Sequence, residues 1–121
     1  VAVAIALNKL MGEGKLKDFP IKKLVAAVSA GIYEGEAILD LNYPEDRDAA
    51  VDFNIVMTED GQFVELQGSG EESTFSPAEM TAMLELAQKG IETLVTLQKE
   101  AIIAADQAGP ADLDSLKDAF Q

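Results

Sequence analysis

The chain has 121 residues, enough for one domain, or half of a larger one, with a single hydrophobic core. It lacks Cys and His, which excludes disulfides, thiolate nucleophiles and Ser–His catalysis. Its net charge of −13, from 22 acidic and 9 basic residues, is opposite in sign to that of a free-standing nucleic-acid binder. We therefore expect a globular acidic domain that meets a polyanion only through a partner subunit, another segment or bound cations.

The N-terminal segment, residues 1–11, is predicted to be the end of a buried helix. Val3, Leu7 and Leu10 recur at helical spacing, and Gly12 follows as a stop signal. The apolar run is too short to span a membrane and lacks the basic start of a signal peptide, so we expect a cytoplasmic protein. The run has the form of a helix cut at its beginning, which indicates that the chain starts inside a larger protein.

A hairpin of two strands is predicted at residues 24–41. Its first strand carries small and β-branched side chains without charge, as in a strand that is buried on both faces. Glu34-Gly35 makes the turn, and Asp40 lies at the end of the second strand. Residues 42–48, NYPEDRD, are predicted to be an acidic loop, because Asn, Asp and Pro favour turns.

A second hairpin is predicted at residues 49–67. Its first strand alternates between apolar residues that face a core, Val51, Phe53, Ile55 and Met57, and residues that face away, Asp52, Asn54 and Val56. An Asp-Gly pair makes the tight turn that follows. In the last strand, strict alternation places Phe63 on the same face as Glu65 and Gln67. The sequence therefore leaves open which face of this strand turns to the core.

A long helix is predicted over residues 76–105, after the polar connector GSGEEST. Ser76 is its N-cap, Pro77 takes the first helical position and Glu79 completes a capping box. Apolar residues recur at spacings of three and four: Met80, Met83, Leu84, Ala87, Ile91, Leu94, Val95 and Ile102. Gly90 inside this helix costs about 1 kcal/mol relative to Ala, which predicts a closely packed partner at that point.

The predicted fold class is α+β. A four-stranded, mostly antiparallel sheet packs against the long C-terminal helix and the N-terminal helix. The long helix is expected to cover the apolar face of the second hairpin. We assign residues 1–105 to this domain and residues 106–121 to an acidic tail. The tail either frays or forms a short docking helix. The docking helix is an alternative because the apolar residues of the tail share one helical face.

Acidic residues gather around the end of the first hairpin. Asp40, Asp46 and Asp52 recur every six residues, with Glu45 and Asp48 nearby. Carboxylates brought together repel each other unless a cation joins them. A hard divalent ion is the natural partner, and Mg²⁺ takes one or two protein carboxylates together with waters and phosphate oxygens. The pattern predicts a Mg²⁺ or Mn²⁺ site that serves phosphate chemistry, and a solvated acidic turn is the alternative that the spacing leaves open.

The order of short motifs along the chain resembles that of the ribonuclease PH family. VAAVSAGI is followed by D-L-x-Y-x-E-D, then D-x-N-x-V-M-T, then V-E-L-Q-G, and finally by a long helix that ends in LQKEA. Over roughly residues 1–104 the chain is similar to the second half of these phosphorolytic 3′-exoribonucleases. The resemblance implies the second half of the ribonuclease PH fold.

The resemblance also implies roles for the acidic residues. Asp40 and Asp46 match the family's catalytic carboxylates, which bind the divalent ion, and Asp52 matches a supporting acidic position. In this family, inorganic phosphate attacks the 3′-terminal phosphodiester of RNA, such as a tRNA 3′ end, and releases a nucleoside diphosphate. Asp40 or Asp46 is alternatively an acid toward the leaving ribose oxygen. Arg47 lies among the acids, where the family usually has a small residue, and is expected to offset part of their repulsion.

Two departures from the family pattern bear on activity. The phosphate-binding segment G-G-T-R-T-A is absent and is expected upstream of Val1, together with the basic residues that contact RNA. The family forms hexameric rings, so we expect a homo-oligomer that acts on RNA and has no membrane partner. On this interpretation, the chain carries the metal-binding end of the site and is inactive alone.

Other classes of function remain open. One is a ring subunit of a related polyribonucleotide phosphorylase or exosome-like complex. Against it, the phosphorylase continues into RNA-binding modules where this chain ends in an acidic tail, and non-catalytic ring subunits tend to lose the acids that this chain retains. The other is a non-enzymatic interaction domain whose acids are solvated surface.

Overall fold

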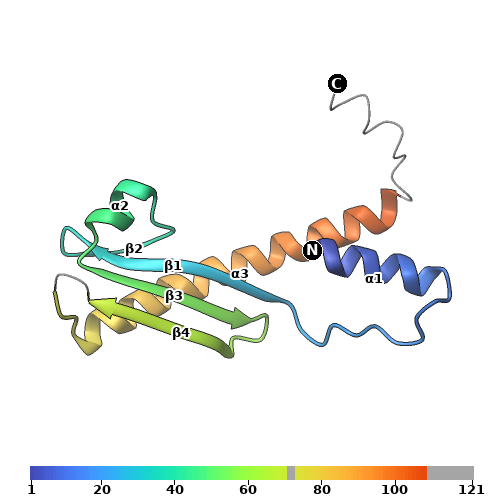
Figure 1. The fold of residues 1–121 in the computed structure, drawn as a ribbon, viewed down its shortest axis with the longest axis horizontal. Coiled ribbons are helices and arrows are strands. Elements are labelled where there is room, and N and C mark those ends of the chain that lie inside the picture. The colour runs from blue at the N-terminus through green and yellow to red at the C-terminus, as the bar shows by residue number, and fades with distance from the viewer. Residues whose placement is uncertain (71–72, 109–121) are drawn as a thin grey trace, which may run out of the picture. The chain divides into compact units, whose positions relative to one another are not determined.

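The computed structural model describes residues 1–70 and 73–108 of the chain (Figure 1). Its elements are, in order, α1 Ala2–Gly12, β1 Val25–Tyr33, β2 Glu36–Leu39, α2 Tyr43–Asp48, β3 Val51–Thr58, β4 Phe63–Gly70 and α3 Pro77–Ala108. The predicted α+β class is confirmed. Residues 106–108 of the predicted tail belong to α3, and the rest of the tail lies outside the described residues.

The chain divides into two compact units. The larger unit, Lys23–Leu97, holds the sheet, α2 and most of α3. The smaller unit holds α1 and the end of α3 from Gln98 onward. The predicted N-terminal helix is present as α1, but the prediction that this helix is buried is wrong, since Val3 is 67% exposed and Ala4 alone among its residues is buried. Within the described residues, none of the helices combines the length and the apolar character that crossing a membrane requires.

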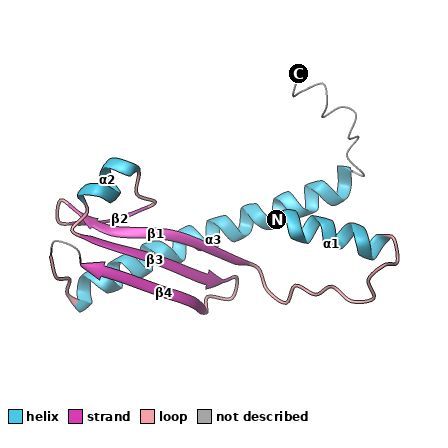
Figure 2. Ribbon diagram, in the orientation of Figure 1, coloured by secondary structure: helices cyan, strands magenta, loops and turns pink. Residues whose placement is uncertain are grey.

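The strands form one antiparallel sheet in the order β2-β1-β3-β4 (Figure 2). Both predicted hairpins are present, and pairing between β1 and β3 joins them. β2 is short and pairs only with the Ala30–Tyr33 part of β1. In the part of the chain that the structure describes, residues 25–29 of β1 therefore have no strand on their outer side.

The core lies between one face of the sheet and α3 (Figure 1). The predicted inward residues of β3 are all buried, namely Val51, Phe53, Ile55 and Met57. They belong to one hydrophobic cluster with the buried residues of α3, Met83, Ala87, Ile91 and Val95. This confirms the prediction that the long helix covers the apolar face of the second hairpin. Burial of each Val, Ile, Phe or Met side chain in this cluster contributes roughly 1.5–3 kcal/mol.

A register shift between β3 and β4 decides which face of β4 turns to the core. Phe63 lies opposite Met57, and Glu65 lies opposite Val56, so Val64 is an extra residue between the two pairs. Phe63 therefore turns to the core side and Glu65 to the other side. The bulge explains why strict alternation along this strand gave conflicting faces.

β4 continues to Gly70, so the prediction of a connector beginning at residue 68 is wrong. A Cβ on Gly68 would overlap the ring of Phe53, which fills the space above that strand. Phe75 packs edge-on against the same ring, with the ring centroids 5.1 Å apart and an angle of 81° between the ring planes. Gly68 therefore permits close packing within the sheet rather than a turn.

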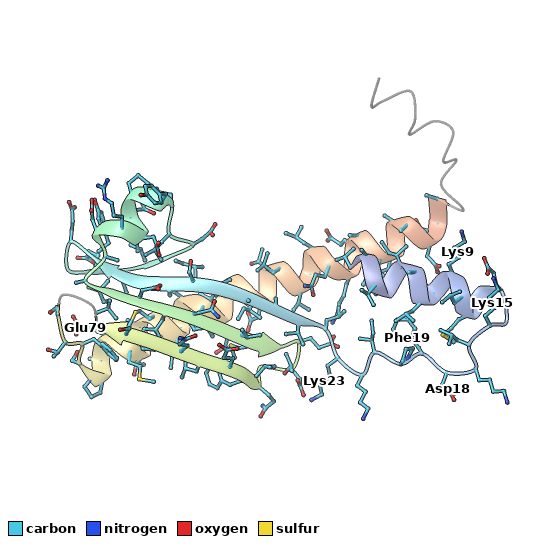
Figure 3. All side chains as sticks on the ribbon, in the orientation of Figure 1. Lys9, Lys15, Asp18, Phe19, Lys23 and Glu79 are labelled. Atoms are coloured by element: carbon cyan, nitrogen blue, oxygen red, sulfur yellow. The ribbon has the colours of Figure 1, made fainter. Side chains whose placement is uncertain are left out.

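α3 begins with the predicted capping box, which includes Glu79 (labelled in Figure 3). The backbone N–H of Glu79 donates to Ser76 Oγ at 3.2 Å, and the backbone N–H of Ser76 donates to Glu79 Oε2 at 2.7 Å. These hydrogen bonds lower the pKa of Glu79, that from the Ser76 backbone most strongly, because they stabilise its carboxylate. The predicted close contact at Gly90 is also confirmed, since a Cβ there would lie 2.8 Å from Leu39 Cδ2.

We predict that Gly68→Ala lowers the free energy of unfolding by about 1–3 kcal/mol, because the new Cβ must displace the ring that Phe75 holds in place. Urea denaturation followed by circular dichroism measures the change. Gly12→Ala in α1 is the control, since nothing lies within 4 Å of its Cβ position and Ala favours a helix. Equal effects of the two substitutions would contradict the packing role of Gly68.

We also predict that ionisation of Glu79 contributes to the pH dependence of stability. Its pKa is lowered from the ordinary value of 4.5, so the unfolded chain binds this proton more readily than the folded protein does. The contribution is fully present above the ordinary value and is lost as the pH falls through the lower folded-state pKa. Glu79→Gln keeps the hydrogen-bonding shape without the charge, so its unfolding free energy should vary less with pH in this range. Urea titrations at several pH values measure both slopes, and identical slopes would overturn the assignment.

Candidate functional site

Asp40 lies directly after β2 in a left-handed backbone conformation, with φ of 58°. Among residues other than glycine, Asp and Asn accept this conformation most readily. The backbone N–H of Asp40 donates to the C=O of Ser29 on β1 at 2.8 Å, and regular pairing of β2 stops there. Asp40 therefore turns the chain away from the sheet and leaves an exposed carboxylate at the sheet edge.

The acidic segment that follows is a helix, so the prediction of a loop over residues 42–48 is wrong. α2 is held by a capping box in which Asn42 Oδ1 accepts from the Glu45 N–H at 3.1 Å and Glu45 Oε2 accepts from the Asn42 N–H at 2.9 Å. Pro44 occupies the start of the helix, where its missing N–H costs nothing. Asp46 is exposed in the first turn, where the helix dipole favours a negative charge.

Arg47 makes a two-point ion pair with its neighbour Asp48. Arg47 Nε and Nη2 donate to the two carboxylate oxygens, each at 2.7 Å. The hydrogen bond from Arg47 lowers the pKa of the Asp48 carboxyl. The pair is exposed, so it adds little to stability. Arg47, which was expected to offset the repulsion among the acids, therefore pairs with Asp48 and not with the predicted metal ligands.

Asp52 lies on β3, on the sheet face opposite the core, and is partly buried. Across the sheet its neighbours are Gly31 on β1 and Ser69 on β4. A Cβ on Gly31 would lie 2.9 Å from Leu41 Cδ2, so the Leu41 side chain covers β1 at this point. The segment that carries Asp40 thus folds back over the same sheet face that carries Asp52.

The three predicted ligands, Asp40, Asp46 and Asp52, come from the end of β2, from α2 and from β3. The described side chains form no group of three or more acids close enough to share an ion, so a three-carboxylate site is not preformed. The donor chemistry does fit, because Mg²⁺ prefers hard oxygen ligands and needs only one or two protein carboxylates. The assignment of these residues as ligands stays a prediction.

A groove of about 580 Å³ includes Asp40 in its wall. Its lining residues are Ala27, Val28, Ser29, Leu39, Asp40, Asn54, Gly90, Thr93 and Leu94. It borders the part of β1 that β2 leaves uncovered, and α3 supplies another wall. All of its lining belongs to the larger unit.

The sequence did not reveal this groove. The prediction that Asn54 faces away from the core is correct. The sequence did not predict that Ser29 is its neighbour, because this depends on how β1 pairs with β3. The groove also depends on the early end of β2, which periodicity does not give.

These features define an α+β domain with acidic residues at the end of β2, on α2 and at the start of β3. A family model described as 3′ exoribonuclease family, domain 2, matches residues 23–90. The match covers more than half of the chain, so the chain belongs to the 3′ exoribonuclease family and corresponds to its second domain. The resemblance to ribonuclease PH in motif order is confirmed. At the family level, this membership supports an RNA-processing enzyme that binds RNA and forms oligomers.

We predict that Asn42→Ala loosens α2. Loss of the oxygen that accepts from the Glu45 N–H costs about 1 kcal/mol, which corresponds to about fivefold faster exchange of the amide hydrogens of Glu45 and Asp46. Hydrogen exchange followed by NMR measures these rates. Asn42→Asp retains a capping oxygen and should exchange like the unmodified protein. Unchanged exchange in Asn42→Ala would contradict the role of the cap.

Proposed function

We propose that the chain is the metal-binding domain of a phosphorolytic 3′-to-5′ exoribonuclease that trims tRNA 3′ ends. The observation that carries this proposal is the family match over residues 23–90, which spans Asp40, Asp46 and Asp52. These residues offer the hard oxygen ligands that suit Mg²⁺ or Mn²⁺. Inorganic phosphate is the co-substrate, and a hexameric ring is the expected assembly.

Asp40 and Asp46 would hold the ion, with Asp52 in support. Their backbones are anchored in different ways, Asp40 by its hydrogen bond to β1 and Asp46 by the capped first turn of α2. Fixed backbones favour a site that must hold reacting groups in one geometry. When bound, the ion would neutralise the crowded phosphate oxygens and stabilise charge in the transition state.

In the proposed reaction, an oxygen of inorganic phosphate forms a bond to the phosphorus of the last phosphodiester. The bond from that phosphorus to the 3′ oxygen of the preceding ribose breaks. The terminal nucleotide leaves as a nucleoside diphosphate, and the shortened RNA keeps a 3′-hydroxyl. A proton must reach this leaving oxygen, and supplying it is the alternative role of Asp40 or Asp46, in place of binding the ion.

We predict that Asp40→Asn and Asp46→Asn each lower phosphate-dependent release of nucleoside diphosphates at least about 100-fold in the full-length protein. Asn accepts the left-handed backbone at residue 40, so the loss in Asp40→Asn does not come from backbone strain. The assay follows a tRNA with a 3′ extension in the presence of Mg²⁺ and phosphate.

Glu85→Gln is the matched control, since this acid is exposed on α3, and its activity should be unchanged. Calorimetry with Mn²⁺ should show binding that weakens in the same two Asp variants. Full activity in both Asp variants would contradict the assigned roles. Absence of Mn²⁺ binding to the full-length protein, with or without phosphate, would favour a non-enzymatic acidic domain.

A further inference from the structure

The groove beside β1 lies between the edge of a strand and a helix. β2 pairs only with the Ala30–Tyr33 part of β1, so within the described residues the first part of β1 has an uncovered edge. On the other side, α3 contributes Gly90 and Leu94 to the lining. The volume of about 580 Å³ is large enough for several side chains. The groove therefore offers both a strand edge and a helical wall to an occupant.

The backbone of β1 directs hydrogen-bonding groups into this groove. In an antiparallel sheet, successive residues turn their N–H and C=O groups alternately to the two neighbouring strands. The Ser29 C=O accepts from the Asp40 N–H at 2.8 Å on the side of β2. Ala27, two residues before Ser29, therefore directs its N–H and C=O to the same side, where β2 has already ended. A strand added at this point would pair with both groups.

The uncovered edge lacks the features that normally prevent a strand edge from pairing. Sheet edges are protected by charged residues, prolines or bulges. Residues 25–29, VAAVS, contain neither charge nor proline, and they pair with β3 without a register shift. β4, the outer strand on the other side of the sheet, has a bulge at Val64 followed by the charged Glu65. The edge of β1 is therefore the better acceptor for an added strand.

A strand added in line with β2 would place alternate side chains against α3. Residues directly opposite each other in a sheet share a face. Ala26 belongs to the core cluster under α3, and Val28 packs against that cluster. Residues opposite Ala26 and Val28 would therefore face α3 as well. Leu94 lines the groove there, and Leu97, one turn further along α3, is 54% exposed, so apolar side chains at these two positions would find apolar contacts.

Charge favours a basic occupant. Asp40 lies in the wall of the groove, and neither Lys nor Arg is among the described residues that line it. Residues 23–97 contain 15 acidic and 3 basic residues. Nucleic acid or a second copy of this chain would therefore be repelled, whereas Lys or Arg beside Asp40 would be attracted. A strand that continues the line of β2 begins beside Asp40, so its basic residue belongs at its N-terminal end.

We propose that the groove is a docking site for an extended, basic segment of another protein, which adds to the sheet as a strand in line with β2. One residue of the segment exchanges hydrogen bonds with Ala27. The residues on either side of it are apolar and lie against α3, and Lys or Arg precedes them beside Asp40. Backbone pairing supplies affinity, and the alternate side chains supply selectivity. The proposal does not depend on the proposed function.

The test uses the full-length protein and the peptide K-K-V-T-V-T, which carries a fluorophore at its C-terminus. Its two valines match the positions opposite Val28 and Ala26, and fluorescence anisotropy measures binding. The peptide E-E-V-T-V-T reverses the charge. A third peptide has an N-methyl group on the threonine between the valines, which removes the N–H that would donate to Ala27. Each of these two peptides should bind about tenfold more weakly or worse. Absence of binding by K-K-V-T-V-T, or equal binding of its N-methylated form, would overturn the proposal.

Protein variants locate the peptide on the structure. Leu94→Lys should weaken binding about tenfold or more, since it puts a positive charge in the apolar wall. Ile103→Lys is the matched control, because Ile103 is an exposed apolar residue of α3 that does not line the groove. Circular dichroism checks that both variants keep their fold. Equal effects of the two changes would contradict the site.

A backbone variant tests the strand pairing itself. Ala27→Pro removes the N–H that an added strand would use, and proline is accepted where a strand N–H faces away from its sheet. This variant should lose peptide binding. In the unmodified protein, the peptide should slow hydrogen exchange over residues 25–29, which mass spectrometry measures. Unchanged exchange in the presence of bound peptide would overturn the assignment to this edge.

Other occupants of the groove give different results. If a second copy of the chain fills it, Leu94→Lys should lower the molecular mass measured by light scattering, and the peptide should not bind. If RNA fills it, an oligoribonucleotide should slow hydrogen exchange over residues 25–29 in the absence of phosphate and metal. Either outcome would overturn the proposal.

Discussion

Alternation along β3 organises the whole domain. β3 pairs with β1 on one side and with β4 on the other. Its apolar side chains enter the cluster with α3, and Asp52 and Asn54 therefore lie on the opposite face. A slip of one residue would exchange the two faces, exposing the core and burying a carboxylate. The register that gives the domain its core is thus the register that presents the polar residues of the candidate site.

Much of this fold could be predicted because its signals are local. The capping box at Ser76, the stripe on α3 and the alternation on β3 each occupy one element and follow from its own period. β4 could not be oriented in this way, since Val64 is an extra residue whose presence is defined only against the partner strand. Gly68 was wrongly assigned to a connector for a similar reason. The sequence does not distinguish a glycine that makes room for a ring on another strand from a glycine that makes a turn.

The candidate site was predictable in composition but not in arrangement. Asp40, Asp46 and Asp52 stand out by spacing, yet their distances depend on a left-handed residue, a short helix and a strand register. Asn42 and Pro44 were interpreted as turn formers, although the same residues begin α2. With six residues, that helix is too short to leave a periodic apolar pattern, and its capping box was the available signal.

The left-handed backbone of Asp40 has a consequence for how substitutions at that position are interpreted. Gly satisfies the backbone requirement without supplying a carboxylate, whereas Glu supplies the carboxylate on a backbone that resists this conformation. A survey of all amino acids at this position would therefore superimpose two separate requirements, one conformational and one chemical. Tolerance of Gly with intolerance of Glu would show that shape dominates, and the reverse would show that charge does. Aspartate is the residue that meets both.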